Sequence, residues 1–238
     1  MDIVSSHLDT QARALDCQRP VYVVDDDSMV RRALFLALRT AGFQPRSFSS
    51  GRDFLDEVET LASGCVLLDL RLPEMDGIAI LREMGAQTQR LPVVMITGHG
   101  EVEVAVRAMK QGASDFLEKP LKDDELLNLL EELFGGLTVQ AELAAQQELA
   151  VQSLKELTPR EREILQGMID GLTNKLVAQR LDISARTVEV HRANMMKKLE
   201  TGSVSEATRL ALLAGMKPSG SFAQRRKRSD KSVTISSI

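Results

Sequence analysis

Aspartates follow two apolar runs that have the character of buried β-strands. Residues 21–24 are followed directly by Asp25 and Asp26, and residues 66–68 are followed by Asp69. Continuous apolar runs are typical of parallel strands that are covered on both faces, and open α/β sheets bind ligands at the carboxyl ends of their strands. Since carboxylate oxygens are preferred ligands of hard cations, these aspartates predict a magnesium site.

Two further polar groups are expected at the same edge of the sheet. The run at 93–96 ends at Thr97, and the run at 115–118 ends at Lys119 and Pro120. A hydroxyl and an ammonium group beside a metal can contact the phosphoryl oxygens that the metal does not cover. The whole set therefore predicts phosphoryl-transfer chemistry.

The elements that would position these groups alternate between strand and helix from residue 20 to about residue 134. This alternation predicts five βα units and a doubly wound parallel sheet, an α/β fold of the flavodoxin-like type. Gly42, Gly64 and Gly112 stand where helices are predicted to stop. The strands are expected at 21–24, 44–48, 65–68, 92–96 and 115–118, and the helices near 28–41, 51–61, 77–84, 101–111 and 123–134.

From Leu157 onwards the pattern changes to short helices without strands. Thr158 is a predicted N-cap, Pro159 takes the first helical position, and Glu161 can close a capping box on Thr158. Thr173 and Ser184 are the predicted caps of the next two helices. The pattern predicts an all-α unit with helices near 159–170, 174–181, 185–199 and 204–214.

Charge separates the chain into an acidic front and a basic back. Residues 20–137 hold 12 cationic and 20 acidic side chains, and residues 153–217 hold 11 and 8. This asymmetry favours a metal-handling domain joined to an anion-binding domain. The predicted segments are a flexible N-terminus at 1–19, an α/β domain at 20–135, a helical linker at 136–155, an all-α domain at 156–217 and a disordered basic tail at 218–238.

Cysteine usage and hydropathy indicate the cellular compartment in which the protein works. The chain has two cysteines, Cys17 and Cys65, which support neither a disulfide framework nor a cysteine metal site. No apolar stretch is long enough to span a bilayer, and the first residues lack the features of a signal peptide. We therefore expect a cytoplasmic protein with no membrane partner.

The front domain resembles the receiver domain of bacterial response regulators. The resemblance implies that Asp69 accepts a phosphoryl group from a sensor histidine kinase. It also implies an Mg²⁺ site formed by Asp26 directly, Asp25 through water, Asp69 and the backbone carbonyl of Arg71. The motifs that carry it are Val-Asp-Asp-Asp at 24–27, Leu-Asp-Leu-Arg-Leu-Pro-Glu-Met-Asp-Gly at 68–77, Ile-Thr-Gly-His-Gly at 96–100 and Glu-Lys-Pro at 118–120.

The same resemblance assigns roles to three more residues. Thr97 would hydrogen-bond one phosphoryl oxygen, Lys119 would pair with another, and Phe116 would move inward together with Thr97. Phe116 could instead be a core residue. Asp27 has two open interpretations, a solvated bystander or a helix N-cap. Lys119-Pro120 resembles the cis peptide of the family.

The back domain resembles the helix-turn-helix domain of the LuxR/NarL/FixJ class, and both halves together place the chain closest to the FixJ-like subgroup. This implies a transcription regulator that dimerises on phosphorylation and has RNA polymerase as a further partner. The motifs are Leu-Thr-Pro-Arg-Glu-Arg-Glu-Ile-Leu at 157–165, Gly-Leu-Thr-Asn-Lys at 171–175, Ala-Gln-Arg-Leu at 178–181 and the run at 183–199.

The helix at 185–199 is the predicted recognition helix for double-stranded DNA. Val188, Met195 and Leu199 share one apolar face that should pack inward, which leaves the polar face for the major groove. Glu189, Val190 and Ala193 are the candidate base readers on that face. The remaining predicted DNA-binding residues are Asn174, Lys175, Thr187, His191, Arg192, Asn194, Lys197 and Lys198, most of them as backbone contacts.

Two other functions stay open at this point. A haloacid-dehalogenase-like phosphatase could use the acids at 25–27, Thr97 and Lys119, with Asp123 and Asp124 as its last motif, although Asp69 would then be idle. The second alternative is a DNA-binding protein whose receiver domain is dormant, so that DNA binding does not depend on phosphorylation.

The basic run at 225–228 could add unspecific attraction to DNA phosphates, or it could be a solvated terminus.

Overall fold

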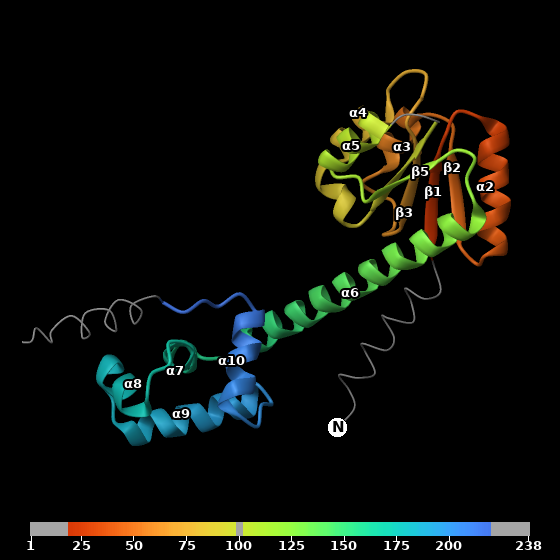
Figure 1. Cartoon of the computed structure of the whole chain (residues 1–238). Helices are drawn as coiled ribbons and strands as arrows, with labels where there is room; N and C mark the ends of the chain where they lie inside the picture. The colour runs from red at the N-terminus through yellow and green to blue at the C-terminus, as the bar shows by residue number, and fades with distance from the viewer. Residues whose placement is uncertain (1–18, 99–101, 220–238) are drawn as a thin grey trace, which may run out of the picture. The chain divides into compact units, whose positions relative to one another are not determined.

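The computed structural model describes residues 19–98 and 102–219, and these form two compact units that divide after Glu142 (Figure 1). Almost all of the predicted N-terminal segment and of the predicted basic tail lies outside the described residues, as do Cys17 and His99. Within the described part of the chain, no helix is both long and apolar enough to cross a bilayer.

A five-stranded parallel sheet forms the centre of the first unit. The strands are β1 (Pro20–Val24), β2 (Gln44–Phe48), β3 (Cys65–Asp69), β4 (Val93–Thr97) and β5 (Asp115–Glu118). Their order is β2-β1-β3-β4-β5, and every neighbouring pair is parallel. The predicted doubly wound α/β fold is confirmed.

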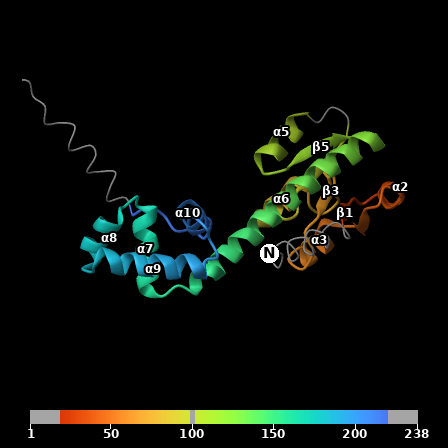
Figure 2. The same ribbon diagram turned by 90° about the horizontal axis from the view of Figure 1, so that it is seen from below.

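Helices cover both faces of this sheet because successive strand residues point to opposite faces. Tyr22 and Val24 of β1 belong to one apolar layer, which lies under α3 (Gly51–Glu57), α4 (Gly77–Met84) and α5 (Val102–Lys110). Val21 and Val23 belong to the other layer, with α2 (Ser28–Thr40) and α6 (Asp123–Lys155). Figure 1 shows the sheet between α3, α4 and α5 on one side and α2 on the other, and in Figure 2 α6 runs across the strands.

Glycines mark two helix ends as expected but not the third. Gly42 and Gly112 follow α2 and α5 with φ angles of 87° and 100°, in the left-handed region that favours glycine. The assignment of Gly64 as a helix stop was wrong, because α3 already ends at Glu57. A Cβ atom on Gly64 would lie 2.3 Å from the carbonyl oxygen of Pro20. Gly64 therefore permits the close approach of the chain to β1.

The end of α6 extends well beyond the predicted last helix of the sheet domain. This helix runs without interruption from Asp123 to Lys155 and includes the segment expected to be a linker. The sequence pattern also did not predict the short 3₁₀ helix η1 (Gly85–Gln89), which connects α4 to β4.

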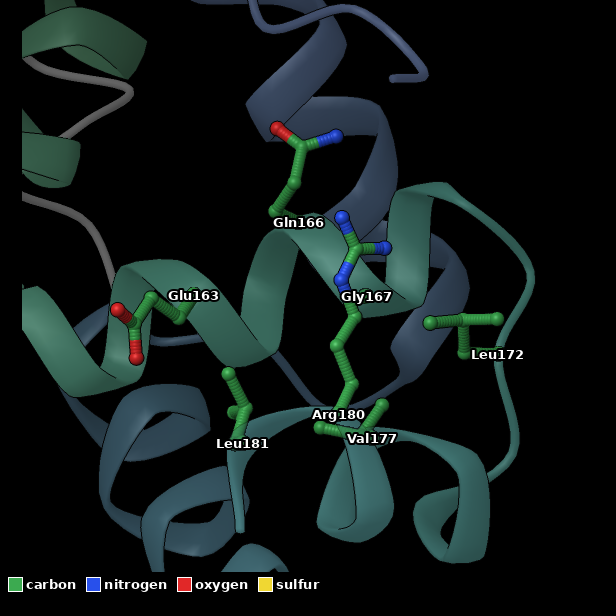
Figure 3. Close-up of a pocket in the computed structure, with 7 residues that line it drawn as sticks. All are labelled: Glu163, Gln166, Gly167, Leu172, Val177, Arg180 and Leu181. Carbon is green, nitrogen blue, oxygen red and sulfur yellow. The ribbon is translucent and has the colours of Figure 1, made fainter. Parts of the chain in front are cut away.

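The second unit contains the four predicted helices, α7 (Pro159–Ile169), α8 (Asn174–Leu181), α9 (Ala185–Lys198) and α10 (Val204–Leu213). Thr158, Thr173 and Ser184 cap the first three, and the capping box of Thr158 with Glu161 is present. A Cβ atom on Gly167 would lie 2.8 Å from a methyl group of Val177, so α7 and α8 pack closely there. A hollow of about 270 Å³ opens beside this contact (Figure 3).

Candidate functional site

The sheet brings together the three aspartates that were predicted to meet. Val24 of β1 is paired with Leu68 of β3, so the residues that follow them, Asp25 and Asp69, lie side by side. One carboxylate oxygen from each of Asp25, Asp26 and Asp69 lies within 4.8 Å of the other two. Asp25 and Asp69 are buried and Asp26 is exposed.

Lys119 reaches the same cluster from the end of β5. Its Nζ lies 3.0 Å from Oδ2 of Asp25 and 3.0 Å from Oδ2 of Asp69. The Lys119 backbone N–H donates to the carbonyl oxygen of Thr97 at 2.9 Å, which joins the ends of β4 and β5. The Lys119-Pro120 peptide is cis, as the resemblance implied. Thr97 is buried beside this junction, with an exposed fraction of 4%.

The charges and pKa shifts of the cluster are those expected of a site that binds a cation and contains a nucleophilic carboxylate. Burial raises the pKa of Asp69 above its ordinary value, and the hydrogen bond from Lys119 opposes this shift only in part. Burial lowers the pKa of Lys119, but the two carboxylates that it contacts outweigh burial and raise that pKa. The three carboxylates outnumber the single Lys119 ammonium group, so the cluster has a net negative charge and oxygen atoms that can coordinate a cation. This donor set fits a hard divalent cation such as Mg²⁺.

Asp27 does not belong to the cluster. Its side chain accepts a hydrogen bond from the backbone N–H of Met29 at 2.8 Å and caps α2, which decides between the two open interpretations. Its own backbone N–H donates to Oδ1 of Asp25 at 2.8 Å, and Arg31 donates to the Asp25 carbonyl oxygen at 2.7 Å. The start of α2 therefore orients the Asp25 carboxylate.

Gly77 supports the loop after β3, and the sequence analysis gave it no role. Its N–H donates to the Leu70 carbonyl oxygen at 2.9 Å, and a Cβ atom on it would lie 2.6 Å from the carbonyl oxygen of Asp69. The backbone N–H of Arg71 lies 3.4 Å from Oδ1 of Asp69. Only glycine allows α4 to begin this close to β3. The Met-Asp-Gly run at a helix start was the available signal.

Phe116 is not a core residue, so that interpretation was wrong. Its exposed fraction is 43%, although its neighbour Leu117 is buried in the sheet. On α5, Val106 and Met109 are exposed to a similar extent, at 48% and 42%. The first unit thus presents several large apolar side chains from α5 and β5 to its surroundings.

The faces of α9 divide as the sequence predicted. Val188, Met195 and Leu199 are buried, which confirms the inward face. Glu189, Val190, Ala193, Asn194, Lys197 and Lys198 are exposed, whereas Thr187, His191 and Arg192 are half-buried. On α8, Asn174 is half-buried and Lys175 is exposed.

Three of the predicted DNA-binding residues already have side-chain partners on another helix of the second unit. Arg192 donates to the side-chain oxygen of Asn174, which ties α9 to the start of α8. Nζ of Lys198 lies 2.8 Å from Oε2 of buried Glu161. Lys197 has no ionic partner among the residues that the structure describes. The sequence analysis missed both cross-helix pairs.

Comparisons with known proteins agree with both halves of the chain. Residues 21–131 match the response regulator receiver domain, and residues 155–211 match the luxR family of bacterial regulatory proteins. The transcriptional regulatory protein FixJ of Bradyrhizobium diazoefficiens is 46% identical over 200 residues, which cover 82% of this chain and 96% of that protein. Response regulator protein TmoT of Ectopseudomonas mendocina is 38% identical, over 82% of this chain and 89% of its own.

Two solved structures give the same assignment. The response regulator StyR superimposes with a TM-score of 0.70 at 38% identity, covering 82% of this chain and 98% of its own. Full-length FixJ from B. japonicum gives a TM-score of 0.53 at 44% identity, covering 83% and 98%.

A receiver fold with an acidic cluster, followed by a helix-turn-helix unit, defines a two-component response regulator, and this chain belongs to that family. Within it the chain is FixJ-like and regulates transcription through two-component signalling. The phosphatase alternative has no support, since Asp123 and Asp124 lie in the first turn of α6 and do not follow a strand.

Proposed function

We propose that Asp69 accepts a phosphoryl group from the phosphohistidine of a sensor kinase. The observation that carries this proposal is the convergence of three carboxylates within 4.8 Å, with Lys119 bridging two of them. Asp26 and Asp69 would bind Mg²⁺ directly, Asp25 through water, and the Arg71 carbonyl would complete the protein ligands. A bound Mg²⁺ offsets the negative charge of the phosphoryl oxygens.

The protein side of the transfer follows from the positions of these groups. A carboxylate oxygen of Asp69 attacks phosphorus, a P–O bond forms, the P–N bond to histidine breaks, and the leaving imidazole keeps the electron pair and takes up a proton. Lys119 stays charged and pairs with a phosphoryl oxygen, as Thr97 does through its hydroxyl. Because the acceptor is part of the chain, the protein is proposed to turn over no separate substrate, apart from slow self-dephosphorylation.

Movements of Thr97 and Phe116 would transmit the phosphorylation of Asp69 to the surface of the first unit. When Thr97 moves towards the phosphoryl group, half-exposed Phe116 would move inward and change the surface formed by α5, β5 and α6. The exposed apolar side chains Val106 and Met109 on α5 make this surface a suitable homodimer interface. Phosphorylation acts here as a local charge change that biases a two-state element.

Dimerisation would place two copies of α9 on a two-fold DNA site in the cytoplasm, where RNA polymerase is a further partner. Exposed Glu189 and Val190 would read base edges, because neither side chain is part of the buried face of α9. Phosphates would be contacted by the remaining polar residues of α8 and α9, which are Asn174, Lys175, Thr187, His191, Arg192, Asn194, Lys197 and Lys198.

Labelling with acetyl phosphate in Mg²⁺ tests the acceptor assignment. Asp69→Asn should abolish labelling because an amide is a far poorer nucleophile. Asp27→Asn is the matched control, since asparagine still caps a helix and residue 27 lies outside the cluster. Undiminished labelling of Asp69→Asn, or labelling that moves to Asp25, would overturn the assignment. A wild-type chain that is never labelled would favour the dormant receiver.

A further inference from the structure

Two adjacent glycines, Gly135 and Gly136, lie in the interior of α6. Figure 1 shows α6 as one continuous helix, and both glycines are exposed. A Cβ atom on either glycine would have no neighbour within 4 Å among the described residues, apart from the backbone of the helix itself. Packing therefore does not require glycine at these positions, in contrast to Gly64 and Gly77.

The glycine pair is the least stable point of this helix. Apart from Gly135 and Gly136, residues 123–155 contain neither glycine nor proline. A glycine in a helix interior lowers the equilibrium constant for helix formation about fivefold relative to alanine, so that the pair lowers it about 30-fold. No packing contact of the two glycines within the described part of the chain compensates for this loss.

The residues around the pair can end one helix and begin another. If a helix ended at Phe134, Gly135 would take the next position, where glycine is favoured because the backbone turns into the left-handed region. Thr138 is a preferred N-cap residue for a helix that begins at Val139. In the continuous helix its hydroxyl donates to the Phe134 carbonyl oxygen at 2.9 Å, a contact that often bends helices. The segment 134–138, here called the hinge turn, therefore fits one long helix or two shorter ones.

The hinge turn lies where α6 leaves the core of the first unit. The ring of Phe134 lies 5.7 Å from the ring of Phe43 and 4.9 Å from the guanidinium carbon of Arg19. Leu137 is the last residue of α6 that packs against this core, and Leu154 is the first that belongs to the core of the second unit. The residues between these two leucines, all within the described part of the chain, belong to neither core.

We propose that α6 opens at the hinge turn and that the opened form allows the two copies of α9 in a dimer to fit a two-fold DNA site. This inference rests on the dimerisation and DNA binding proposed above. The DNA helix sets the spacing of two half-sites, whereas uninterrupted helices would fix the spacing of the two copies of α9 independently of the DNA. A segment with two conformations removes this conflict, because the opened form adapts to the spacing of the site.

Hydrogen exchange of the unlabelled full chain tests the hinge turn by itself. When the turn opens, the amides of residues 138–140 lose their bonds to the carbonyl groups of residues 134–136. G135A/G136A should slow the exchange of these amides about 30-fold, because alanine favours the helix and its Cβ has room. The matched control Q146A/Q147A changes two exposed residues of the same helix that already favour helix formation, and it should leave this exchange unchanged.

Thr138 provides an independent test of the opened form. Thr138→Val removes the hydroxyl and with it the N-cap of the second helix, so exchange of the same amides should slow about fivefold. Thr138→Ser keeps a capping hydroxyl and should preserve the wild-type rate. Faster exchange in Thr138→Val than in the wild type would show that the hydroxyl stabilises the continuous helix and would overturn the proposed cap.

DNA binding by the labelled protein tests the role of the opening. On a two-fold site obtained by selection, G135A/G136A should weaken binding by up to about 30-fold for each copy that must open, and binding to one half of that site should not change. Addition of Q146G/Q147G to G135A/G136A creates a new glycine pair further along α6. This combination should restore binding to the two-fold site, although exchange at residues 138–140 should stay slow.

The possible results separate the hinge turn from its alternatives. Equal exchange at residues 138–140 in the wild type and G135A/G136A would show that the helix does not open there. Slower exchange with unchanged binding to the two-fold site would overturn the role of the opening in DNA binding. If Q146G/Q147G does not restore binding, the native glycines serve as a contact surface and the proposal is wrong. A wild type whose DNA affinity does not respond to labelling would contradict the proposed function instead, and the exchange data would still decide whether α6 opens.

Discussion

Replacement of Glu161 by glutamine should destabilise the second unit through the loss of a buried charge pair. Oε2 of Glu161 accepts from the backbone N–H of Thr158 at 2.8 Å and from Nζ of Lys198 at 2.8 Å, and the residue is only 3% exposed. Glutamine keeps the volume of the side chain and can still accept from Thr158. The substitution therefore removes chiefly the interaction between α7 and α9.

The magnitude lies between two limits. Exposed ion pairs contribute about 0–1 kcal/mol, and removal of one partner from a buried pair costs about 3–5 kcal/mol. Since the Lys198 side chain is 36% exposed, we expect solvent to screen the pair and the cost to be about 2 kcal/mol. For a unit of this size that corresponds to a decrease in Tm of roughly 8–16 °C.

The pH dependence provides a second measure. Burial raises the pKa of Glu161, but the hydrogen bonds from Lys198 and Thr158 outweigh burial and place the pKa below the ordinary value of 4.5. A lowered pKa means that the stabilisation is complete above the unfolded-state pKa and is lost as pH falls through the folded-state pKa. The stability difference between the wild type and Glu161→Gln should be constant above about pH 5.5 and shrink on acidification below about pH 4.5.

Calorimetry of the full chain, with hydrogen exchange of the α7 and α9 amides to identify the unit that opens, measures both effects. Glu163→Gln is the matched control on the same helix, because the Glu163 side chain is 52% exposed where it pairs with Arg160. We expect this control to change the stability by less than about 0.5 kcal/mol. If the two variants are equally stable, or if their difference does not depend on pH, the reasoning about the buried pair is refuted.

Four further outcomes are expected. Lys119→Met should reduce the rate of labelling by acetyl phosphate roughly 10²-fold, measured by intact-mass spectrometry, because one charge-stabilising donor is removed; an unchanged rate would remove Lys119 from the site. Gly77→Ala should destabilise the first unit by about 1–3 kcal/mol in denaturant titration, because the added Cβ meets the backbone of β3, and an unaffected midpoint would contradict this. Labelled protein should sediment as a dimer where unlabelled protein is a monomer, with a coupling of about 1–3 kcal/mol, whereas equal dimerisation in both states would favour a dormant receiver. Lys197→Ala should weaken binding to all DNA sequences alike, while Glu189→Ala and Val190→Ala should each change the preferred base pairs by roughly 1–3 kcal/mol in a binding-site selection; recovery of the parental site by both would place other side chains in the groove.

The sequence by itself determined the class of fold and most of the helix and strand bounds. The physical reason is that these features are local. A strand covered on both faces must be apolar throughout, and a helix start needs a capping oxygen, as at Thr158, Thr173 and Ser184. The convergence of Asp25, Asp26 and Asp69 was also predictable, since parallel strands present their carboxyl ends at one edge.

Tertiary structure decided which of several chemically similar residues serve the site and which serve the fold. Asp27 has the same side chain as Asp25 and Asp26, but the start of α2 uses it as a cap. Lys198 resembles its neighbour Lys197 in sequence, yet it faces Glu161 on another helix, 37 residues away in the chain. Gly64 and Gly77 are needed because backbone atoms of distant residues lie against them. Contacts between distant segments depend on packing across the whole unit, and no local pattern of residue types encodes them.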